Sequence, residues 1–531
     1  MNMRRTLKKR GGAAIAIAAV GALALTACAT ADSGEGETLT YVFAIDDDPR
    51  GMNAQFVRVP EASMFSAQML EPLIFMSSDY ELTPGLAESW ELSDDGLELV
   101  FTLREGVTWH DGEPFTAEDV KFNFEEIDPV SSYSWSIESV LESIEIEGDT
   151  EVTLSLSEPF GPLLEAISQH YMLPQHIYEG TEYITNDANM APIGTGPMMF
   201  ESYSSGEEVT LLKNPDYWGG EIAVDRAVFP IMGDANSRAE ALFSGEIDQG
   251  IVPFSQRPRV EEDPNTVFLE ETAHPQVVSL GFNALGESLQ DAAVRQAVYA
   301  AFDRENISDD VLQGLGEPAR TFFPEALGWA NSPNVDLLEQ FPHDVDAINQ
   351  ALDDAGFPRG DNGERFTLDI RYSTARPDTA AIAEVAQSKL AEVGIGLNLM
   401  GSAGAVFAEA VFTDSDFDLV LIPNTSGADP SLALANWYAC NEEKLPSANP
   451  SQLCDDQIDA AVDAAAATSN VDERSEAFAA MSERAAEVMI YAPLVWFNGT
   501  FPSANTTRWD GQTEKPVDTS RVPWTSLTPK A

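Results

Sequence analysis

The sequence has 531 residues, of which 88 are Asp or Glu and only 29 are Lys or Arg, so its formal net charge is −59 at pH 7. This charge argues against a nucleic-acid-binding function, which requires a cationic face. The acidic surplus favours a solubilising shell, although steering of cationic ligands is also consistent with it. With 44% hydrophobic residues, the chain can form two or more globular domains.

The N-terminus has the order of a secretory signal, with basic residues first, an apolar run over 11–25 and small residues before Cys28. The ending Leu25-Thr26-Ala27-Cys28 resembles the bacterial lipobox, in which a signal peptidase cuts before the cysteine and the thiol carries lipid. We therefore expect a signal peptide over 1–27, lipidation at Cys28 and a flexible tether over 28–37. No second apolar run of about 18 residues follows, so we expect no membrane-spanning helix.

Strand and helix patterns alternate through the next part of the chain. Apolar residues alternate over 39–45, 97–103 and 152–156, which predicts three strands. Thr116 is followed three residues later by Asp119, and this spacing is typical of a helix start with a capping box.

Two more helices are predicted further along. Ser237 followed by Glu240 indicates another capping-box start, and Gly245 suits the end of that helix. Between Asp291 and Ile307, apolar residues recur at helical spacing and form one stripe.

The clearest pattern covers residues 366–423 and predicts the fold class. Strands are expected near 366–372, 397–399 and 417–423, with helices over 378–393 and 405–412. This β-α-β-α-β order implies a parallel sheet with helices on its faces, and therefore an α/β fold. Because such sheets bind ligands beyond the carboxyl ends of their strands, we expect a ligand near the loop 423–429.

We find no sequence motif typical of catalysis or of cofactor binding. Gly-x-Ser-x-Gly, the phosphate-binding loop, Gly-x-Gly-x-x-Gly and His-Glu-x-x-His are all absent. His170 and His176 are six residues apart, which does not place them on one helix face as a metal pair. We therefore expect neither an enzyme nor a bound cofactor or metal.

Cys440 and Cys454 remain once Cys28 is assigned to lipid. In an oxidising compartment, a disulfide that closes this short loop is the favoured interpretation. A metal site is less favoured, because no His is near either cysteine.

Several stretches, taken together in their order and spacing, resemble one family. They are 82–90 (LTPGLAESW), 101–112 (FTLREGVTWHDG), 114–120 (PFTAEDV), 194–197 (GTGP), 213–218 (KNPDYW), 279–283 (SLGFN), 294–297 (VRQA) and 302–305 (FDRE). The chain resembles the extracytoplasmic solute-binding proteins of ABC importers, in the oligopeptide-, dipeptide- and nickel-binding class (bacterial family 5). The match extends from about residue 38 to 500.

The resemblance implies a periplasmic-binding-protein-like fold of type II, with two lobes and a hinged cleft between them. Lobe I would comprise 38–60, 193–282 and 495–531, with an inserted subdomain over 61–192, and lobe II would comprise 283–494. The chain would cross between lobes near Phe282-Asn283 and near Val495-Trp496, and the cleft would close by a hinge motion.

The same resemblance implies a function and its partners. We expect a monomeric, lipid-anchored protein on the outer face of the cytoplasmic membrane or in the periplasm. It would capture a peptide or peptide-like solute and deliver it to an ABC permease with its ATPase subunits. An oligosaccharide, an opine or a metal chelate is the alternative solute. A secreted hydrolase is opposed by the missing nucleophile motifs, and a sensor or adhesion lipoprotein on the same scaffold is a third hypothesis.

Peptide binders of this family hold the peptide amine with an Asp four residues before a Pro. In the matching loop here, Ser426 takes that place before Pro430, which weakens the prediction of amine recognition. Asp429 matches the structural acidic residue before the Pro. Asn424 and Thr425 complete the candidate ligand-binding loop.

Four more candidates come from other segments. Asp48 could hold an amine and Arg50 a carboxylate, because 48–53 matches a cleft-lining segment of the family; alternatively both are rim charges. Trp135 and Trp437 could wall the pocket, with core packing as the alternative for each.

Overall fold

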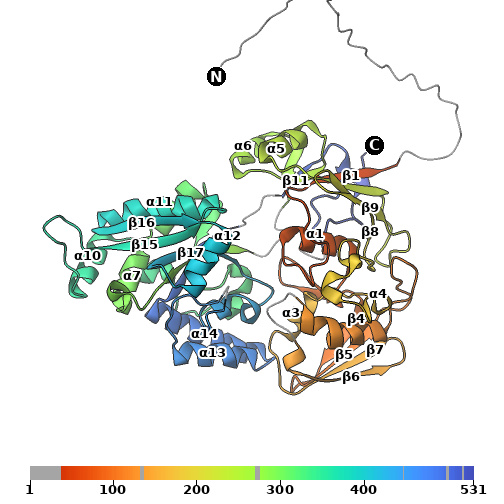
Figure 1. Ribbon diagram of the computed structural model, residues 1–531, viewed down its shortest axis with the longest axis horizontal. Helices are drawn as coiled ribbons and strands as arrows, with labels where there is room; N and C mark the ends of the chain where they lie inside the picture. Colours follow the sequence, from red (N-terminus) through yellow and green to blue (C-terminus); the bar gives the residue numbers. More distant parts are fainter. Residues whose placement is uncertain are drawn as a thin grey trace, which may run out of the picture. The chain divides into compact units, whose positions relative to one another are not determined.

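The computed structural model describes residues 38–131, 137–269, 275–445, 448–497, 502–516 and 520–530 (Figure 1). Residues 39–531 form one compact unit. The predicted signal peptide, Cys28, the tether and Trp135 lie outside the described residues. Among the helices of the described part, none has the length and apolarity needed to cross a membrane.

The first sheet has seven strands in the order β12-β19-β11-β1-β10-β9-β8. Its strands are β1 (Thr40–Ala44), β8 (Met198–Ser204), β9 (Glu208–Lys213), β10 (Arg226–Pro230), β11 (Gln249–Ile251), β12 (Thr266–Phe268) and β19 (Pro502–Asn505). β1 pairs in parallel with β10 and β11, and the other pairs are antiparallel. Tyr41 on β1 makes edge-on contacts with Trp509 and Trp524, so the C-terminal segment completes this core.

The helices and short strands that accompany this sheet are α1 (Pro60–Met69), α5 (Ala235–Ser244), α6 (Arg257–Glu262), β20 (Trp509–Asp510) and β21 (Thr528–Pro529). Helix α5 begins earlier than predicted. Asp234 is its N-cap and accepts hydrogen bonds from the Ser237 backbone N–H and hydroxyl, both at 2.8 Å, so Ser237 lies inside the first turn. Both Asp234 and Ser237 are residue types that cap helices, and in the folded protein Asp234 is the N-cap. The predicted end at Gly245 is confirmed by its φ of +75°.

A separate four-stranded antiparallel sheet, in the order β4-β5-β7-β6, lies within the predicted insertion. Its strands are β4 (Ala87–Leu92), β5 (Glu98–Leu103), β6 (Leu141–Glu147) and β7 (Glu151–Leu156). β2 (Ile74–Met76), β3 (Leu82–Pro84), α2 (Ala117–Phe122), α3 (Leu163–Ser168) and α4 (Gln175–Tyr178) accompany it. The capping box at Thr116 is confirmed, because the Asp119 carboxylate accepts from the Thr116 N–H at 2.9 Å.

The third large sheet has six strands in the order β14-β18-β13-β17-β15-β16. They are β13 (Gln276–Phe282), β14 (Gly316–Pro318), β15 (Phe366–Ser373), β16 (Ile395–Ser402), β17 (Leu419–Thr425) and β18 (Tyr491–Phe497). Its helices are α7 (Ala292–Ala301), α8 (Arg304–Asn306), α9 (Leu337–Gln340), α10 (Val345–Asp354), α11 (Pro377–Glu392), α12 (Gly404–Ala408), α13 (Asp456–Ala466) and α14 (Val471–Val488). β15 pairs in parallel with β16 and β17, which confirms the β-α-β-α-β prediction. The predicted helix over 291–307 ends at Ala301, and Asp303 caps a new turn.

The division of the strands between the two large sheets differs from the predicted lobe boundaries. β13 was expected to belong with the first lobe, but all of it lies in the six-stranded sheet, between β18 and β17. All of β18 lies in that sheet as well, although its last residues were also expected in the first lobe. In chain order, β12 of the seven-stranded sheet precedes β13, and β19 of that sheet follows β18. The predicted boundary between 494 and 495 falls inside β18 and would break its hydrogen-bonded ladder. The boundary at 282/283 falls at the end of β13, and β13 belongs to the six-stranded sheet because it pairs with both β17 and β18.

The motifs that resemble the family mainly build the scaffold. Glu71 is fully buried and accepts hydrogen bonds from the Tyr217 hydroxyl at 3.0 Å and from the Trp218 indole N–H at 2.6 Å. It also pairs with the Arg521 guanidinium at 3.0 Å. One buried carboxylate thus joins the end of the α1 region, the 213–218 motif and the C-terminal segment, and its charge is compensated by these donors.

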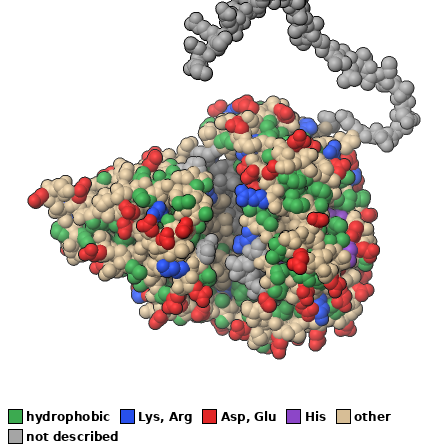
Figure 2. All heavy atoms as spheres, in the orientation of Figure 1, with side chains coloured by type: hydrophobic (Ala, Val, Ile, Leu, Met, Phe, Trp, Pro, Cys, Tyr) green, Lys and Arg blue, Asp and Glu red, His purple; other side chains and the backbone are tan. Residues whose placement is uncertain are grey.

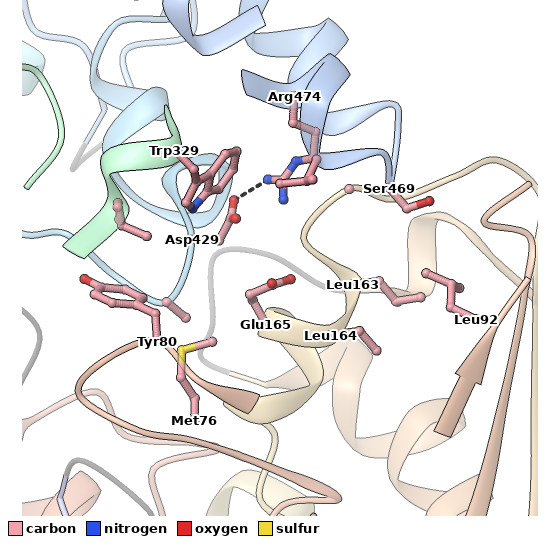
Figure 3. A pocket seen from close by; sticks show the side chains of 14 residues that line it. Met76, Tyr80, Leu92, Leu163, Leu164, Glu165, Trp329, Asp429, Ser469 and Arg474 are labelled. Atoms are coloured by element: carbon pink, nitrogen blue, oxygen red, sulfur yellow. Dashed lines mark hydrogen bonds and ion pairs between the residues drawn. The ribbon is translucent and has the colours of Figure 1, made fainter. Parts of the chain in front are cut away.

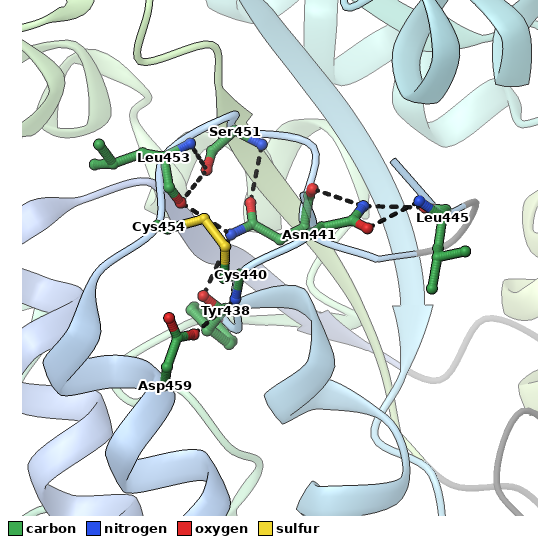
Figure 4. The surroundings of a disulfide bond; sticks show 9 residues. Tyr438, Cys440, Asn441, Leu445, Ser451, Leu453, Cys454 and Asp459 are labelled. Carbon is green, nitrogen blue, oxygen red and sulfur yellow. Dashed lines mark hydrogen bonds between the residues drawn. A yellow bond between two sulfur atoms is a disulfide. The ribbon is translucent and has the colours of Figure 1, made fainter. Parts of the chain in front are cut away.

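Cys440 and Cys454 form a disulfide with 4.6 Å between their Cα atoms (Figure 4). The Cys440 backbone N–H donates to the Asp459 carboxylate on α13 at 2.7 Å. The bridge therefore ties the segment that follows Trp437 to the start of α13.

Candidate functional site

The predicted ligand loop leaves the carboxyl end of β17, as expected for an α/β sheet. Asn424, near the end of β17, donates from its side-chain amide to the Tyr491 hydroxyl on β18. The Trp437 ring stacks on the Tyr491 ring with 5.5 Å between centroids and 15° between planes. The structure therefore brings Asn424 and Trp437 together on one tyrosine. Trp437 is only 8% exposed, so most of its ring serves packing.

Ser426 points away from solvent. Its side chain is fully buried, its hydroxyl is hydrogen-bonded to the Tyr80 hydroxyl, and its backbone N–H donates to the Pro275 carbonyl at 2.9 Å. Burial also raises the pKa of Tyr80 well above its ordinary value, so this phenol stays protonated. Thr425, one residue earlier, is exposed. In this loop Thr425 is therefore open to solvent, while Ser426 holds the loop against the β2–β3 turn.

The Asp429 carboxylate has two hydrogen-bond partners, one in its own loop and one on α14. Its Oδ1 atom accepts from the Ser431 backbone N–H at 2.8 Å, which caps a short 3-10 turn, and from Arg474 Nη2 of α14 at 2.6 Å. Both side chains of this ion pair are at most 5% exposed. Asp429 Oδ2 accepts no hydrogen bond from the described residues. Ala428 and Leu432 pack into the hydrophobic core of the four-stranded sheet, so the loop also joins the two parts of the fold.

Among the described residues, neither Asp48 nor Arg50 forms a hydrogen bond or an ion pair with this loop. Asp48 accepts from the Tyr203 hydroxyl at 2.8 Å, the Ser205 hydroxyl at 2.9 Å and the Gly206 N–H at 3.1 Å. The Gly206 hydrogen bond contributes most to lowering the pKa of Asp48, followed by the two hydroxyls. Asp48 therefore fixes the β8–β9 turn with its lone pairs. Arg50 is exposed and makes no hydrogen bond or ion pair with the described residues.

A cavity of about 200 Å³ lies on the other side of the same loop (Figure 3). Met76, Tyr80, Leu163, Leu164 and Glu165 line it from the side of the four-stranded sheet. Leu327, Trp329, Ala428, Asp429, Val471 and Arg474 line it from the side of the six-stranded sheet. Of these residues only Asp429 was a predicted site residue, and Ala428 beside it belongs to the predicted loop 423–429. No sequence pattern links the others, because they come from five separate segments of the chain.

Glu165 on α3 is the unusual side chain of this cavity. Figure 3 shows its carboxylate pointing into the cavity, on the side where Asp429 and Arg474 form their ion pair. No other described residue donates a hydrogen bond to it. Burial raises the pKa of Glu165 to about 7, the Asp429 carboxylate raises it further and the Arg474 guanidinium opposes the rise. The backbone N–H of Glu165 itself also lowers this pKa by hydrogen bonding, and among the other described residues no side chain or backbone group donates to the carboxylate.

These arrangements support binding more readily than catalysis. Among the described residues, the one group with metal-ligand spacing is Cys440, Glu442 and Cys454, and both of its sulfurs are joined in the disulfide. The loop and the cavity offer aromatic faces, apolar walls, carboxylates and a guanidinium. Such a combination of apolar surface and a few placed polar groups is typical of small-molecule sites.

Comparisons with known proteins agree with this description. Residues 81–444 match the family described as bacterial extracellular solute-binding proteins, family 5. Protein XP55 of Streptomyces lividans is 27% identical over 96% of this chain and 93% of its own length. A putative ABC transporter peptide-binding protein of Brucella ovis is 28% identical over 81% of this chain and 82% of its own.

A solved structure, the ABC transporter substrate-binding protein CtaP of Listeria monocytogenes, is similar with a TM-score of 0.80. It is 26% identical, and the match covers 93% of this chain and all of that one. The fold is the two-lobed α/β fold of periplasmic binding proteins. The chain belongs to family 5 of the bacterial extracellular solute-binding proteins.

Proposed function

We propose that this protein captures a peptide or peptide-like solute between its lobes and delivers it to an ABC permease and its ATPase subunits. The observation that carries the proposal is the family match over residues 81–444. The peptide assignment is supported by the Brucella ovis relative, which is named as a peptide-binding protein. In this proposal the protein binds and releases its solute without chemical change, because its relatives are binding proteins of transport.

The solute would contact the exposed part of the loop after β17, with Thr425 and the edge of Trp437 as wall residues. Asn424 would position that wall through Tyr491. Arg50, which is exposed and unpaired among the described residues, is the candidate partner for a solute carboxylate. Asp48 would act by holding the β8–β9 turn in place.

The cellular setting is part of the same proposal. The chain would be exported, cleaved before Cys28 and held by lipid at the outer face of the membrane, as the Leu-Thr-Ala-Cys ending suggests. It would act as a monomer. A hinge motion between the two lobes would close the cleft over the solute.

Native mass spectrometry of the purified protein without its lipid tests the solute. A series of added masses that fragment as peptides is expected. A single mass of a sugar, an opine or a chelate would overturn the peptide assignment and leave the binding function in place. If no mass is retained, thermal-shift screening decides, because a ligand that binds the folded state raises the melting temperature by mass action.

A further inference from the structure

The cavity under the ligand loop has walls of two kinds. One part is apolar, with Met76, Leu163, Leu164, Leu327 and Val471. The other part carries the charged groups Glu165, Asp429 and Arg474. With Glu165 ionised, two carboxylates face one guanidinium, so the net charge of the cavity is negative. An anionic cavity with apolar walls suits a cation on an apolar stem.

Two carboxylates, those of Asp429 and Glu165, offer acceptor oxygens in this cavity. Asp429 uses Oδ1 for Arg474 and for the Ser431 N–H, and its Oδ2 has no donor among the described residues. The Glu165 carboxylate receives no hydrogen bond from another described residue either, and it points into the cavity (Figure 3). The only donor to the shielded Glu165 carboxylate among the described residues is its own backbone N–H, so its ionised form is unfavourable unless it gains a cation.

The size of the cavity limits what can enter. Sites for whole small-molecule ligands are commonly about 300–1,000 Å³, whereas this cavity is about 200 Å³. It therefore suits one side chain or one short alkyl stem. The Trp329 ring lies in the same wall, and Arg474 already lies over it with 5.1 Å from its Cζ to the ring centroid. The Trp329 ring in the cavity wall therefore already makes one cation–π contact.

We propose that this cavity is a subsite for a primary ammonium group on an aliphatic stem, held by Glu165 and by Asp429 Oδ2. The inference rests on the proposed function, since the cavity shares its wall, Ala428 and Asp429, with the ligand loop. The ammonium can come from a lysine side chain of a bound peptide or from a free alkylamine. An alternative arrangement would turn Glu165 towards Arg474, whose Nη1 has no hydrogen-bond partner among the described residues.

The groups that face Glu165 set the pH dependence. They are Asp429 and Arg474 from the other side of the cavity and Tyr80 from the turn after β2. β2 and β3, which pack against α3, carry no titratable side chain. An ammonium favours the ionised Glu165, so its binding releases the proton that Glu165 holds at acidic pH. Affinity for the ammonium should therefore fall as the pH is lowered from 8 to 5.

The test is isothermal titration of the full mature protein with Ala-Lys-Ala and Ala-norleucine-Ala, which differ only in the ammonium. Wild-type protein is expected to prefer Ala-Lys-Ala about tenfold at pH 8. Glu165→Gln should abolish this preference, and it should shrink in the wild type at pH 5. Glu158→Gln, which removes an exposed carboxylate of the same subdomain outside the cavity, should keep it.

A second variant blocks the cavity without changing its charge. Leu164→Phe narrows the apolar wall and should also reduce the preference for Ala-Lys-Ala. Equal affinities for the two peptides in the wild type, or an unchanged preference in Glu165→Gln, would overturn the subsite. The second result would fit the arrangement in which Glu165 pairs with Arg474.

The source of the ammonium and the proposed function are separated by a further arm. If neither peptide binds, the peptide assignment fails and 1,5-diaminopentane alone tests the cavity. Binding of 1,5-diaminopentane that is lost in Glu165→Gln would support a free-amine subsite. No binding of either the peptides or the diamine would overturn the inference.

Discussion

At the scale of single residues, the side chain of His110 joins two of the sequence motifs through hydrogen bonds. His110 belongs to the turn of the 101–112 motif, and its ring bridges the backbone of the 194–197 motif. Nδ1 accepts from the Gly194 N–H at 3.1 Å, and Nε2 lies 3.0 Å from the Gly196 carbonyl. Only the neutral ring protonated at Nε2 satisfies both contacts, because a protonated Nδ1 would face another donor.

This geometry predicts an unusually acidic histidine. Burial lowers the pKa of His110 to about 4, and the Gly196 carbonyl opposes the shift only in part. Between pH 6.5 and 4 the unfolded chain takes up a proton that the folded protein does not, so the free energy of unfolding falls as the pH is lowered through this window. Through His110, the free energy of unfolding should be lower by about 3 kcal/mol at pH 4 than at neutral pH, and this loss should vanish above pH 7.

The measurement is an NMR titration of protein labelled at the histidine ring carbons. The His110 signal, identified by its loss in His110→Asn, should not titrate above pH 5. His176, which is partly exposed beside Asp111, provides an internal comparison in the same spectra. A midpoint for His110 near 6.5 would contradict the predicted role of its neutral form.

Ser426 gives a second prediction at this scale. An Asp at this position would restore the family's amine-binding residue, and from the sequence alone we would expect a gain in affinity for peptides with a free amine. The structure changes that expectation, because the Ser426 side chain is fully buried against Tyr80. Ser426→Asp should place a carboxylate in the buried position against the Tyr80 hydroxyl. It should therefore lower the free energy of unfolding by about 1–3 kcal/mol and bring no gain in peptide affinity.

Urea unfolding and peptide titration of Ser426→Asp check this prediction, with Thr425→Asp as the matched control. Thr425 is exposed, so its replacement should leave the free energy of unfolding nearly unchanged. Tighter binding of free-amine peptides by Ser426→Asp would show that the loop turns this residue towards the solute.

At the scale of elements, the disulfide and the helix starts illustrate what local patterns predict. Val120, Phe124 and Ile127 follow the Thr116 cap at helical spacing, and all three are buried. The start of α5 was placed three residues too late, because Asp234 and Ser237 both fit the N-cap pattern and only the packed helix distinguishes them. Local patterns therefore identify helices more securely than their first residue.

The segment closed by Cys440 and Cys454 gives the element-scale prediction. The sequence separation of 14 restricts the unfolded chain, so the double variant Cys440→Ser with Cys454→Ser should unfold with about 3 kcal/mol less free energy. Urea unfolding of the variant and of the oxidised wild type measures the difference. The single variant Cys440→Ser should lose as much, because one cysteine cannot form the bridge. An unchanged midpoint in the double variant would show that Asn449 and Asp459 hold this segment without the disulfide.

At the scale of the whole molecule, charge is the dominant feature. Acidic side chains are spread over the visible face of the protein and basic ones are few (Figure 2). With a formal net charge of −59, repulsion among these carboxylates opposes the compact state. Salt shortens the range of this repulsion from about 30 Å at 0.01 M to about 3 Å at 1 M.

The melting temperature should therefore rise by a few degrees between 0.01 M and 1 M NaCl. Differential scanning calorimetry over this range measures the effect, and sucrose at matched viscosity serves as a control without ionic screening. A fall in melting temperature would show that surface ion pairs such as Arg484 with Asp455 outweigh the general repulsion.

The sequence by itself determined the α/β class, the β-α-β-α-β order of residues 366–423 and the family, because these depend on local periodicity and on ordered motifs. It also indicated the loop after β17, since the carboxyl ends of strands in such sheets follow from the element order. Only the tertiary structure decided that β13 and β18 belong to the six-stranded sheet, because strand pairing joins residues more than 200 positions apart. It also decided that Ser426 is buried and that Glu165 faces Asp429 and Arg474, because the orientation and the neighbours of a side chain depend on segments that no local pattern connects.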